Sequence, residues 1–184
     1  MKYFLLQTDS RLNTAPEILD WFQRIDRRNI QMGKSYRIEN RQLFFIKSNQ
    51  NTLFPDVLSF PFFMVSEKIM SVIKLYEPKT IFKEIVLLDR KYAKSCIYYI
   101  PVLEYLDCLS DASSLTRDRS TILNAVINLN KVSDQSIFYV AGVGKLYTVA
   151  RLDIVESFLR RGAKLIELGE VSLEEESGKT YEEV

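Results

Sequence analysis

The feature that most constrains this fold is a succession of short apolar runs, none of which is long. β-Branched and aromatic residues cluster in these runs and turn residues separate them, which is typical of β-strands. We expect strands at residues 2–7, 43–47, 57–65, 82–88, 96–101, 125–129, 137–143 and 146–150. Pro61 interrupts the third run, which restricts that run to a sheet edge or a strand end. The Gly-rich residues 142–145 predict a hairpin turn.

Three other stretches have helical periodicity. In the first, Thr14 and Glu17 form a capping box, Pro16 fits the first helical turn, and apolar residues continue at helical spacing to Ile25. A capping box satisfies backbone N–H groups that are otherwise free at the start of a helix. This pattern therefore predicts a short amphipathic helix near the N-terminus.

The second and third helical stretches have clear ends. Ser66 is a suitable N-cap for a helix that must end before Pro78. Asp153 and Glu156 form another capping-box pattern, and Gly162 stands where a left-handed residue commonly ends a helix. We therefore expect helices from about residue 67 and from about residue 154.

The order of these elements favours one fold class. Strands and helices do not alternate regularly, so we expect an α+β fold with mixed, largely antiparallel sheets and about three helices. A chain of 184 residues with 47% apolar residues is long and apolar enough for one packed core. The sequence shows no repeat of fixed period and no linker, and only residues 109–120 resemble a long loop.

Charge divides the chain into two parts. The net charge is +1, yet residues 167–184 contain seven Glu and one Lys, so the preceding part is basic. We expect a single domain over residues 1–170, followed by an acidic tail over residues 171–184.

Several features favour the cytoplasm. The N-terminus has four consecutive apolar residues at 3–6, whereas a signal peptide needs about 7–15. No run approaches the roughly 20 apolar residues of a membrane-spanning helix. The only cysteines, Cys96 and Cys108, are too few for a disulfide framework. We expect a cytoplasmic protein with free thiols and no membrane partner.

The sequence has no histidine, which excludes Ser-His-Asp and Cys-His catalysis and metal sites built on His. The segment 141–145 resembles part of a phosphate-binding loop, but Tyr139 stands at the first glycine position and Leu146 at the Ser/Thr position. Carboxylate chemistry stays open, because a hydrolase or transferase needs only two acids. Four acids are close in sequence: Glu104, Asp107, Asp111 and Asp118.

Two charged segments are candidates for partner binding. Residues 24–41 carry six basic residues against two acids, a local charge of +4. This segment suits an acidic partner or a nucleic acid, or is simply a solvated face. Near-neutral net charge and the lack of a recognition motif disfavour nucleic acid. The acidic tail is either a solubilising extension or a polyanion that occupies a cationic cleft. The candidate residues are Arg24, Arg27, Arg28, Glu174, Glu175, Glu176, Glu182 and Glu183.

Several segments together resemble a known family. They are M-K-Y-F-L-L at 1–6, F-P-F-F-M-V-S at 60–66, Y-E-P at 76–78, Y-Y-I-P-V-L at 98–103, D-C-L-S at 107–110, I-F at 137–138 and R-L-D-I-V-E-S-F-L-R-R-G-A at 151–163. In these segments the chain resembles immunity protein family 11, whose members are bacterial immunity proteins of polymorphic toxin systems.

The resemblance implies a cytosolic protein that neutralises a cognate toxin domain by direct stoichiometric binding. It implies neither an enzyme nor a cofactor, and it carries over no catalytic residue. The alternatives that the residues leave open are a carboxylate-dependent hydrolase or transferase, and a regulatory or nucleic-acid-binding adaptor.

Overall fold

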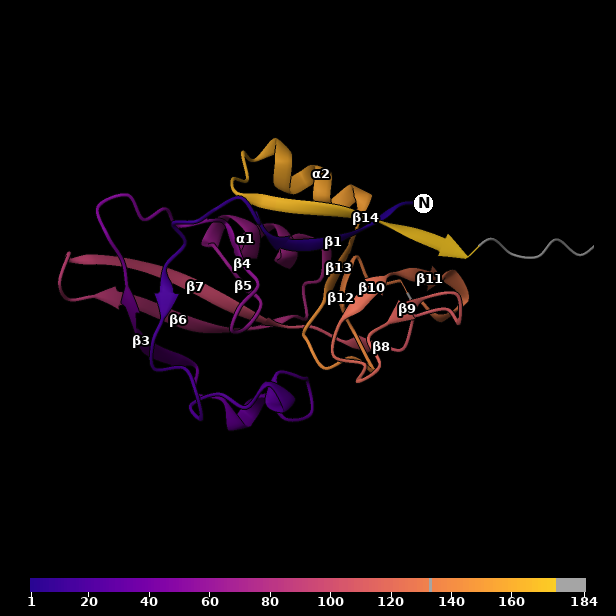
Figure 1. The fold of residues 1–184 in the computed structure, drawn as a ribbon, viewed down its shortest axis with the longest axis horizontal. Helices are drawn as coiled ribbons and strands as arrows, with labels where there is room; N and C mark the ends of the chain where they lie inside the picture. The colour runs from indigo at the N-terminus through magenta and orange to yellow at the C-terminus, as the bar shows by residue number, and fades with distance from the viewer. Residues whose placement is uncertain (133, 175–184) are drawn as a thin grey trace, which may run out of the picture.

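The computed structural model describes residues 1–132 and 134–174, which form two six-stranded sheets, a two-stranded ribbon and two α-helices (Figure 1). Sheet one has the order β11 (Val126–Asn128), β14 (Ile166–Glu174), β1 (Tyr3–Thr8), β13 (Thr148–Arg151), β12 (Ile137–Val140) and β8 (Tyr105–Leu106). Sheet two has the order β2 (Glu17–Ile18), β3 (Arg41–Lys47), β6 (Ile81–Asp89), β7 (Lys94–Val102), β5 (Met64–Val65) and β4 (Val57–Leu58). The ribbon pairs β9 (Ser114–Leu115) with β10 (Ile122–Asn124).

The predicted α+β class with mixed, largely antiparallel sheets is confirmed. The only parallel pairs in the described ranges are β3 with β6, β11 with β14, and β8 with β12. Each predicted strand region contains a strand, although the run at 57–65 divides into β4 and β5, with Pro61 in the connection and β4 at the sheet edge.

The predicted helix at the N-terminus is wrong, so the described chain has two α-helices rather than three. Residues Glu17 and Ile18 pair with β3 instead, and the amide of Leu19 donates to the carbonyl of Phe45 at 3.0 Å. Gln23 has a φ of 64°, which interrupts any helix at this point. The open edge of β3 supplied hydrogen-bond partners that outweighed the local helical pattern.

The other two helices are present as α1 (Glu67–Tyr76) and α2 (Leu152–Arg160). Ser66 is the N-cap residue of α1, as predicted. The capping box of α2 is wrong, because Arg151 is the N-cap residue and Asp153 lies inside the first turn, where it pairs with Arg151 at 2.8 Å. Gly162 has the predicted left-handed conformation with a φ of 70°.

The two sheets share one connectivity that the sequence did not reveal. In sheet two, α1 joins β5 to β6, and β7 lies between them, antiparallel to both. In sheet one, α2 joins β13 to β14, and β1 takes the place of β7. The flanking strands also correspond, since β3 is parallel to β6 and β11 is parallel to β14. The same unit of four strands and one helix thus occurs twice, and the N-terminal strand completes the second copy.

Two cores hold these layers together. The larger core joins both sheets and both helices, and it includes Phe63, Ile69, Tyr139 and Phe158. The smaller core lies between sheet one and the segment after β8, around Cys108 and Phe138. Neighbouring residues of β12 therefore enter different cores, which explains why all four of its side chains are buried.

Strand β14 extends further than the predicted domain boundary. Residues 171–174, assigned to the acidic tail, continue the strand, and Val171 is buried against the smaller core. Their pairing with β11 supplies the backbone hydrogen bonds that a free tail would lack.

Asp56 connects the two helical units. Its carboxylate accepts hydrogen bonds from the Ser66 hydroxyl at 2.6 Å and the Lys164 amide at 2.7 Å, and it pairs with Lys68 at 3.1 Å. Lys68 also donates to the carbonyl of Gly162 at 2.9 Å. Burial alone raises the pKa of Asp56, but these donors outweigh it and hold the pKa below the ordinary 3.8.

We expect the Asp56→Asn variant to lose about 1.5–3 kcal/mol of unfolding free energy at neutral pH, because three donors lose a charged acceptor. Since the folded-state pKa is lowered, the carboxylate stabilises fully above the unfolded pKa near 3.8 and loses this effect as the pH falls through the folded value. Urea denaturation at neutral and acidic pH tests this. If the variant and the parent protein differ in unfolding free energy by the same amount at both pH values, the charge of Asp56 does not have the role assigned to it.

Candidate functional site

The segment between β2 and β3 forms a lobe over sheet two, at the lower side of Figure 1. It contains the short 3₁₀-helices η1 (Arg27–Asn29) and η2 (Ser35–Arg37), and buried isoleucines anchor it to the larger core. The lobe nevertheless leaves large apolar side chains in solvent. They are Leu19, Phe22, Met32 and Tyr36, with exposed fractions of 54%, 70%, 48% and 74%.

Trp21 links this exposed surface to the interior. Its ring makes edge-to-face contacts with Phe22, Phe60 and Phe62, with centroid distances of 5.7, 5.4 and 5.9 Å. Phe62 is buried, whereas Phe60 is 64% exposed. An exposed aromatic that packs on a rigid neighbour loses little conformational freedom on binding, so this cluster is suited to contact a partner.

Arg27 lies against the same cluster. Its guanidinium carbon is 5.8 Å from the ring centroid of Trp21 and 5.8 Å from that of Phe60. No acid pairs with Arg27 within the ranges that the structure describes. The guanidinium is therefore held in position by aromatic faces while its charge stays uncompensated.

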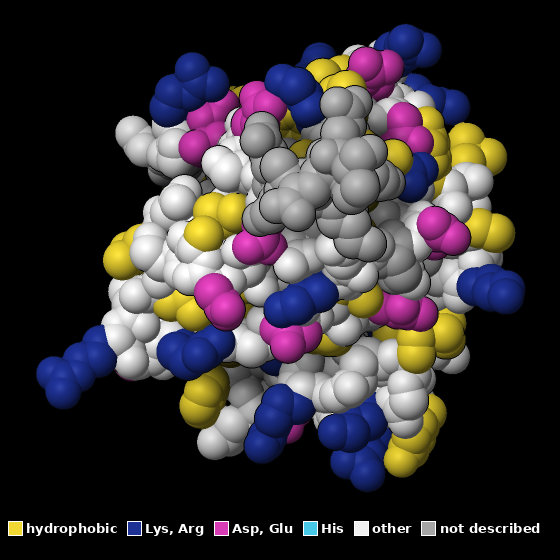
Figure 2. Space-filling view, turned by 90° about the vertical axis from the view of Figure 1, so that its right-hand side faces the viewer, with side chains coloured by type: hydrophobic (Ala, Val, Ile, Leu, Met, Phe, Trp, Pro, Cys, Tyr) yellow, Lys and Arg dark blue, Asp and Glu magenta, His cyan; other side chains and the backbone are white. Residues whose placement is uncertain are grey.

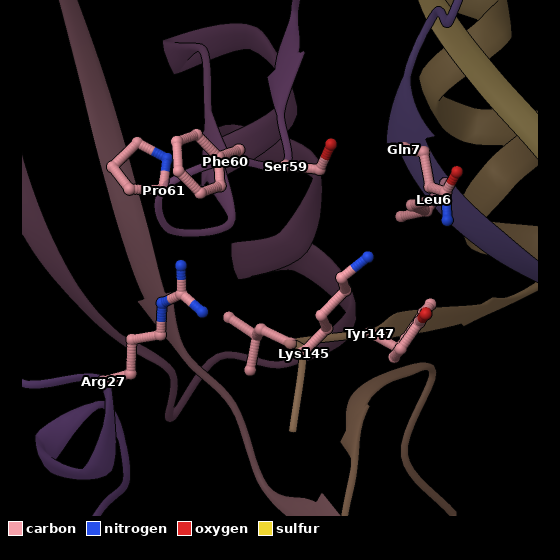
Figure 3. Close-up of a pocket in the computed structure, with 9 residues that line it drawn as sticks. Leu6, Gln7, Arg27, Ser59, Phe60, Pro61, Lys145 and Tyr147 are labelled. Atoms are coloured by element: carbon pink, nitrogen blue, oxygen red, sulfur yellow. The ribbon is translucent and has the colours of Figure 1, made fainter. Parts of the chain in front are cut away.

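Two adjoining hollows extend from Arg27. The first, of about 340 Å³, lies between the lobe, the chain before Phe62 and the β12–β13 hairpin (Figure 3). Its lining residues are Leu6, Gln7, Arg27, Ser59, Phe60, Pro61, Lys145, Leu146 and Tyr147. The second, of about 380 Å³, shares Arg27, Lys145 and Leu146 with the first and adds Arg28 and Lys34. We call these two hollows and the Trp21 cluster the Arg27 groove.

The predicted hairpin turn at 142–145 is confirmed, and it positions Lys145. The amide of Val140 donates to the carbonyl of Tyr147 at 3.0 Å, and the amide of Lys145 donates to the carbonyl of Ser120 at 3.1 Å. A Cβ on Gly144 would lie 3.1 Å from the Cα of Ser120, a tight contact that favours glycine at this position. The Gly-rich segment that resembled a phosphate loop therefore shapes a hairpin.

Ion pairs reduce the charge of the basic stretch. Arg24 pairs with Asp20 at 2.8 Å, Arg28 with Asp26 at 2.7 Å and Arg41 with Glu84 at 2.6 Å. Hydrogen bonds from Arg28 also lower the pKa of Asp26, so that acid stays ionised. Of the three predicted basic site residues, only Arg27 offers an unpaired charge within the described chain.

The acidic candidates do not join this site. Glu174 is exposed at the end of β14, which Figure 1 places well to the side of the lobe. Glu175, Glu176, Glu182 and Glu183 lie outside the described residues. The face from which the chain continues has basic and acidic side chains interspersed, so no area of one sign dominates it (Figure 2).

The four acids suggested for catalysis also stay apart. Asp107 and Asp111 are exposed, and hydroxyl and amide donors of Thr116 and Ser120 lower the pKa of Asp118 to about 2. Glu104 lines a hollow with Glu77, but Glu104 accepts from the Gln135 amide at 2.6 Å, and Glu77 accepts from the Ser136 amide at 2.5 Å. Among the residues that the structure describes, no three Cys, Asp or Glu side chains come together as a metal site would require.

Both cysteines are free, as predicted. Burial raises the pKa of Cys96 and raises that of Cys108 to about 11. Both thiols are therefore protonated at neutral pH, which makes them poor nucleophiles.

The sequence does not single out Trp21, Phe60 or Lys145 as site residues. Trp21 falls within the predicted N-terminal helix, Phe60 within a predicted strand and Lys145 within the predicted turn. The one available signal was the density of aromatic residues around Pro61, because not all of them can be buried.

No protein-family model and no curated protein matches this chain. The resemblance to immunity protein family 11 therefore stays a prediction. In the ranges 1–132 and 134–174, neither α-helix has the length and apolar character needed to cross a bilayer.

Proposed function

We propose that this protein is a bacterial immunity protein that neutralises a cognate toxin domain by binding it directly through the Arg27 groove. One observation carries the proposal: an arginine without an ion pair in the described chain lies against an aromatic cluster in which Phe22 and Phe60 are exposed. Tryptophan, tyrosine and arginine dominate the binding energy of protein interfaces, chiefly where they cluster at a packed centre.

The surroundings of the groove support a protein partner. The same lobe also exposes Leu19, Met32 and Tyr36, and it carries the ion pairs of Arg24 and Arg28. An apolar centre with a polar rim is the usual anatomy of a specific interface, which covers roughly 800 Å² on each partner.

The rival functions have weaker support. A carboxylate enzyme needs two acids that converge on a substrate, yet the four suspected acids are dispersed and the pair at Glu77 and Glu104 already accepts hydrogen bonds from the chain. A nucleic-acid adaptor needs a contiguous row of free cations, and Asp20 and Asp26 interrupt that row.

Co-expression tests the proposal. The toxin domain encoded beside this gene is expressed in bacteria alone, with this protein, and with the Phe60→Ala variant. We expect this protein to restore growth and to co-purify with the toxin domain in equimolar amounts, and we expect the variant to protect less. Growth arrest that persists at high levels of soluble, folded protein would contradict the proposed function.

A further inference from the structure

The first hollow of the Arg27 groove has the features of an acceptor for a negatively charged group. We infer that it binds the carboxylate of an aspartate or glutamate side chain on the partner protein at Arg27, with Lys145 adding positive charge to the same hollow. This inference rests on the proposed function and specifies the chemistry of the partner.

Two cations enter this hollow from different parts of the fold. Figure 3 shows the guanidinium of Arg27 directed toward Pro61 and Phe60, and the Nζ of Lys145 directed toward Ser59 at another part of the same hollow. Neither cation has an ion pair with any acid that the structure describes. Both cations add positive potential to the hollow, and a bound anion would compensate it.

Local contacts restrict both residues before a partner arrives. The guanidinium carbon of Arg27 lies 5.8 Å from the ring centroids of Trp21 and Phe60, and the backbone of Lys145 is fixed by the hairpin contact with Ser120. A group that is already positioned loses less entropy on binding, which improves affinity. Arginine can also donate two parallel hydrogen bonds to one carboxylate, which fixes its orientation.

The rest of the lining strengthens this interaction. Leu6, Phe60, Pro61 and Leu146 supply apolar walls, and these exclude water when a partner covers the hollow. The hydroxyl of Ser59 lies 3.0 Å from that of Thr8, so it has a local partner while the site is empty. A carboxylate on a side chain, with its apolar stem against Phe60 and Leu146, matches this mixture of walls and charges.

The same observations disfavour a phosphate backbone. Nucleic acids present a row of phosphates and need a row of cations, whereas this hollow has two. Asp20 and Asp26 stand beside the neighbouring arginines and would repel the next phosphates. A single carboxylate, which meets only Arg27 and Lys145, avoids this repulsion.

Two short peptides test the inference without the toxin. Acetyl-Phe-Glu-Phe-amide and acetyl-Phe-Gln-Phe-amide are titrated into the isotope-labelled full chain at constant salt, and the signals of Trp21, Arg27 and Lys145 are followed by nuclear magnetic resonance. We expect the glutamate peptide to bind about tenfold more tightly than the glutamine peptide, since a charged hydrogen-bond acceptor is replaced by a neutral one.

Variants connect this preference to the hollow. Lys145→Gln should remove most of the tenfold difference, whereas Lys47→Gln, which changes an exposed lysine at the end of β3, should preserve it. Equal affinities of the two peptides, no binding of either, or a preference that survives Lys145→Gln would overturn the carboxylate site.

A single-stranded deoxythymidine oligonucleotide serves as the second probe. We expect it to leave the Arg27 and Lys145 signals unchanged, and tighter binding than that of the glutamate peptide at this site would also overturn the inference. These outcomes are separate from the growth assay: a toxin that binds elsewhere would leave the peptide result intact, and a failed peptide preference would leave protection intact.

Discussion

Replacing Phe63 by alanine should lower the free energy of unfolding by about 3–5 kcal/mol, because the change leaves a large cavity in a packed core. Phe63 is 1% exposed, and its ring lies edge-on to Tyr139 at a centroid distance of 6.2 Å. The hydroxyl of Tyr139 in turn donates to the carbonyl of Pro101 in β7 at 2.7 Å. Phe63 and Tyr139 thus join sheet two to sheet one, and denaturant unfolding of the variant measures this connection.

Phe22→Ala is the matched control for this prediction. It removes the same ring from a side chain that is 70% exposed, so the free energy of unfolding should change by less than about 0.5 kcal/mol. A loss below about 1 kcal/mol for Phe63→Ala would mean that the core relaxes around the cavity and that this contact does not hold the sheets together.

Replacing Arg27 by alanine should weaken binding of the cognate toxin domain by about 2–4 kcal/mol, the range of an interface hot spot. The variant loses both the stacked cation of the Trp21 cluster and one of the two charges at the first hollow. Its stability should change little, because Arg27 has no ion pair within the described chain. Calorimetric titration against the toxin domain gives the affinity, and thermal unfolding gives the stability.

Arg160→Ala separates this effect from a general loss of charge. Arg160 is exposed on α2 and pairs with Glu156 at 3.4 Å, away from the groove residues. Its removal should change the affinity by less than about 0.5 kcal/mol. If both variants lose the same amount of affinity for the toxin domain, long-range electrostatic attraction rather than contact at the Arg27 groove explains the effect.

Local patterns predicted most elements of the fold. Short runs of β-branched and aromatic residues predicted the long strands β6 and β7, and helical spacing with Ser66 and Gly162 predicted α1 and α2. The same reasoning failed at residues 14–25, because the backbone there pairs with the edge of β3, and no local pattern reveals which strand edge is open.

A repeat of fixed period in the sequence could not reveal the repeated topology. The second unit is completed by β1, at the other end of the chain, so its strands do not follow one another in the order of the first unit. The two units also differ in their side chains. Packing requires an apolar residue at each matching position, but the identity of that residue can differ between the units.

The candidate site was only partly predictable for a similar reason. Arg27 was identified from charge, but a local count could not include Asp20 and Glu84, which lie outside the basic stretch and neutralise two of its members. The groove combines the lobe, the chain around Phe60 and the hairpin at Lys145, three segments that only the tertiary fold brings together.

Hydrogen–deuterium exchange of the protein, alone and with an equimolar amount of the toxin domain, tests the binding surface most directly. The account predicts slower exchange on binding in three segments: residues 21–34, 59–60 and 143–147. A complex that forms without protection in any of these segments would contradict the Arg27 groove as the surface that binds the partner.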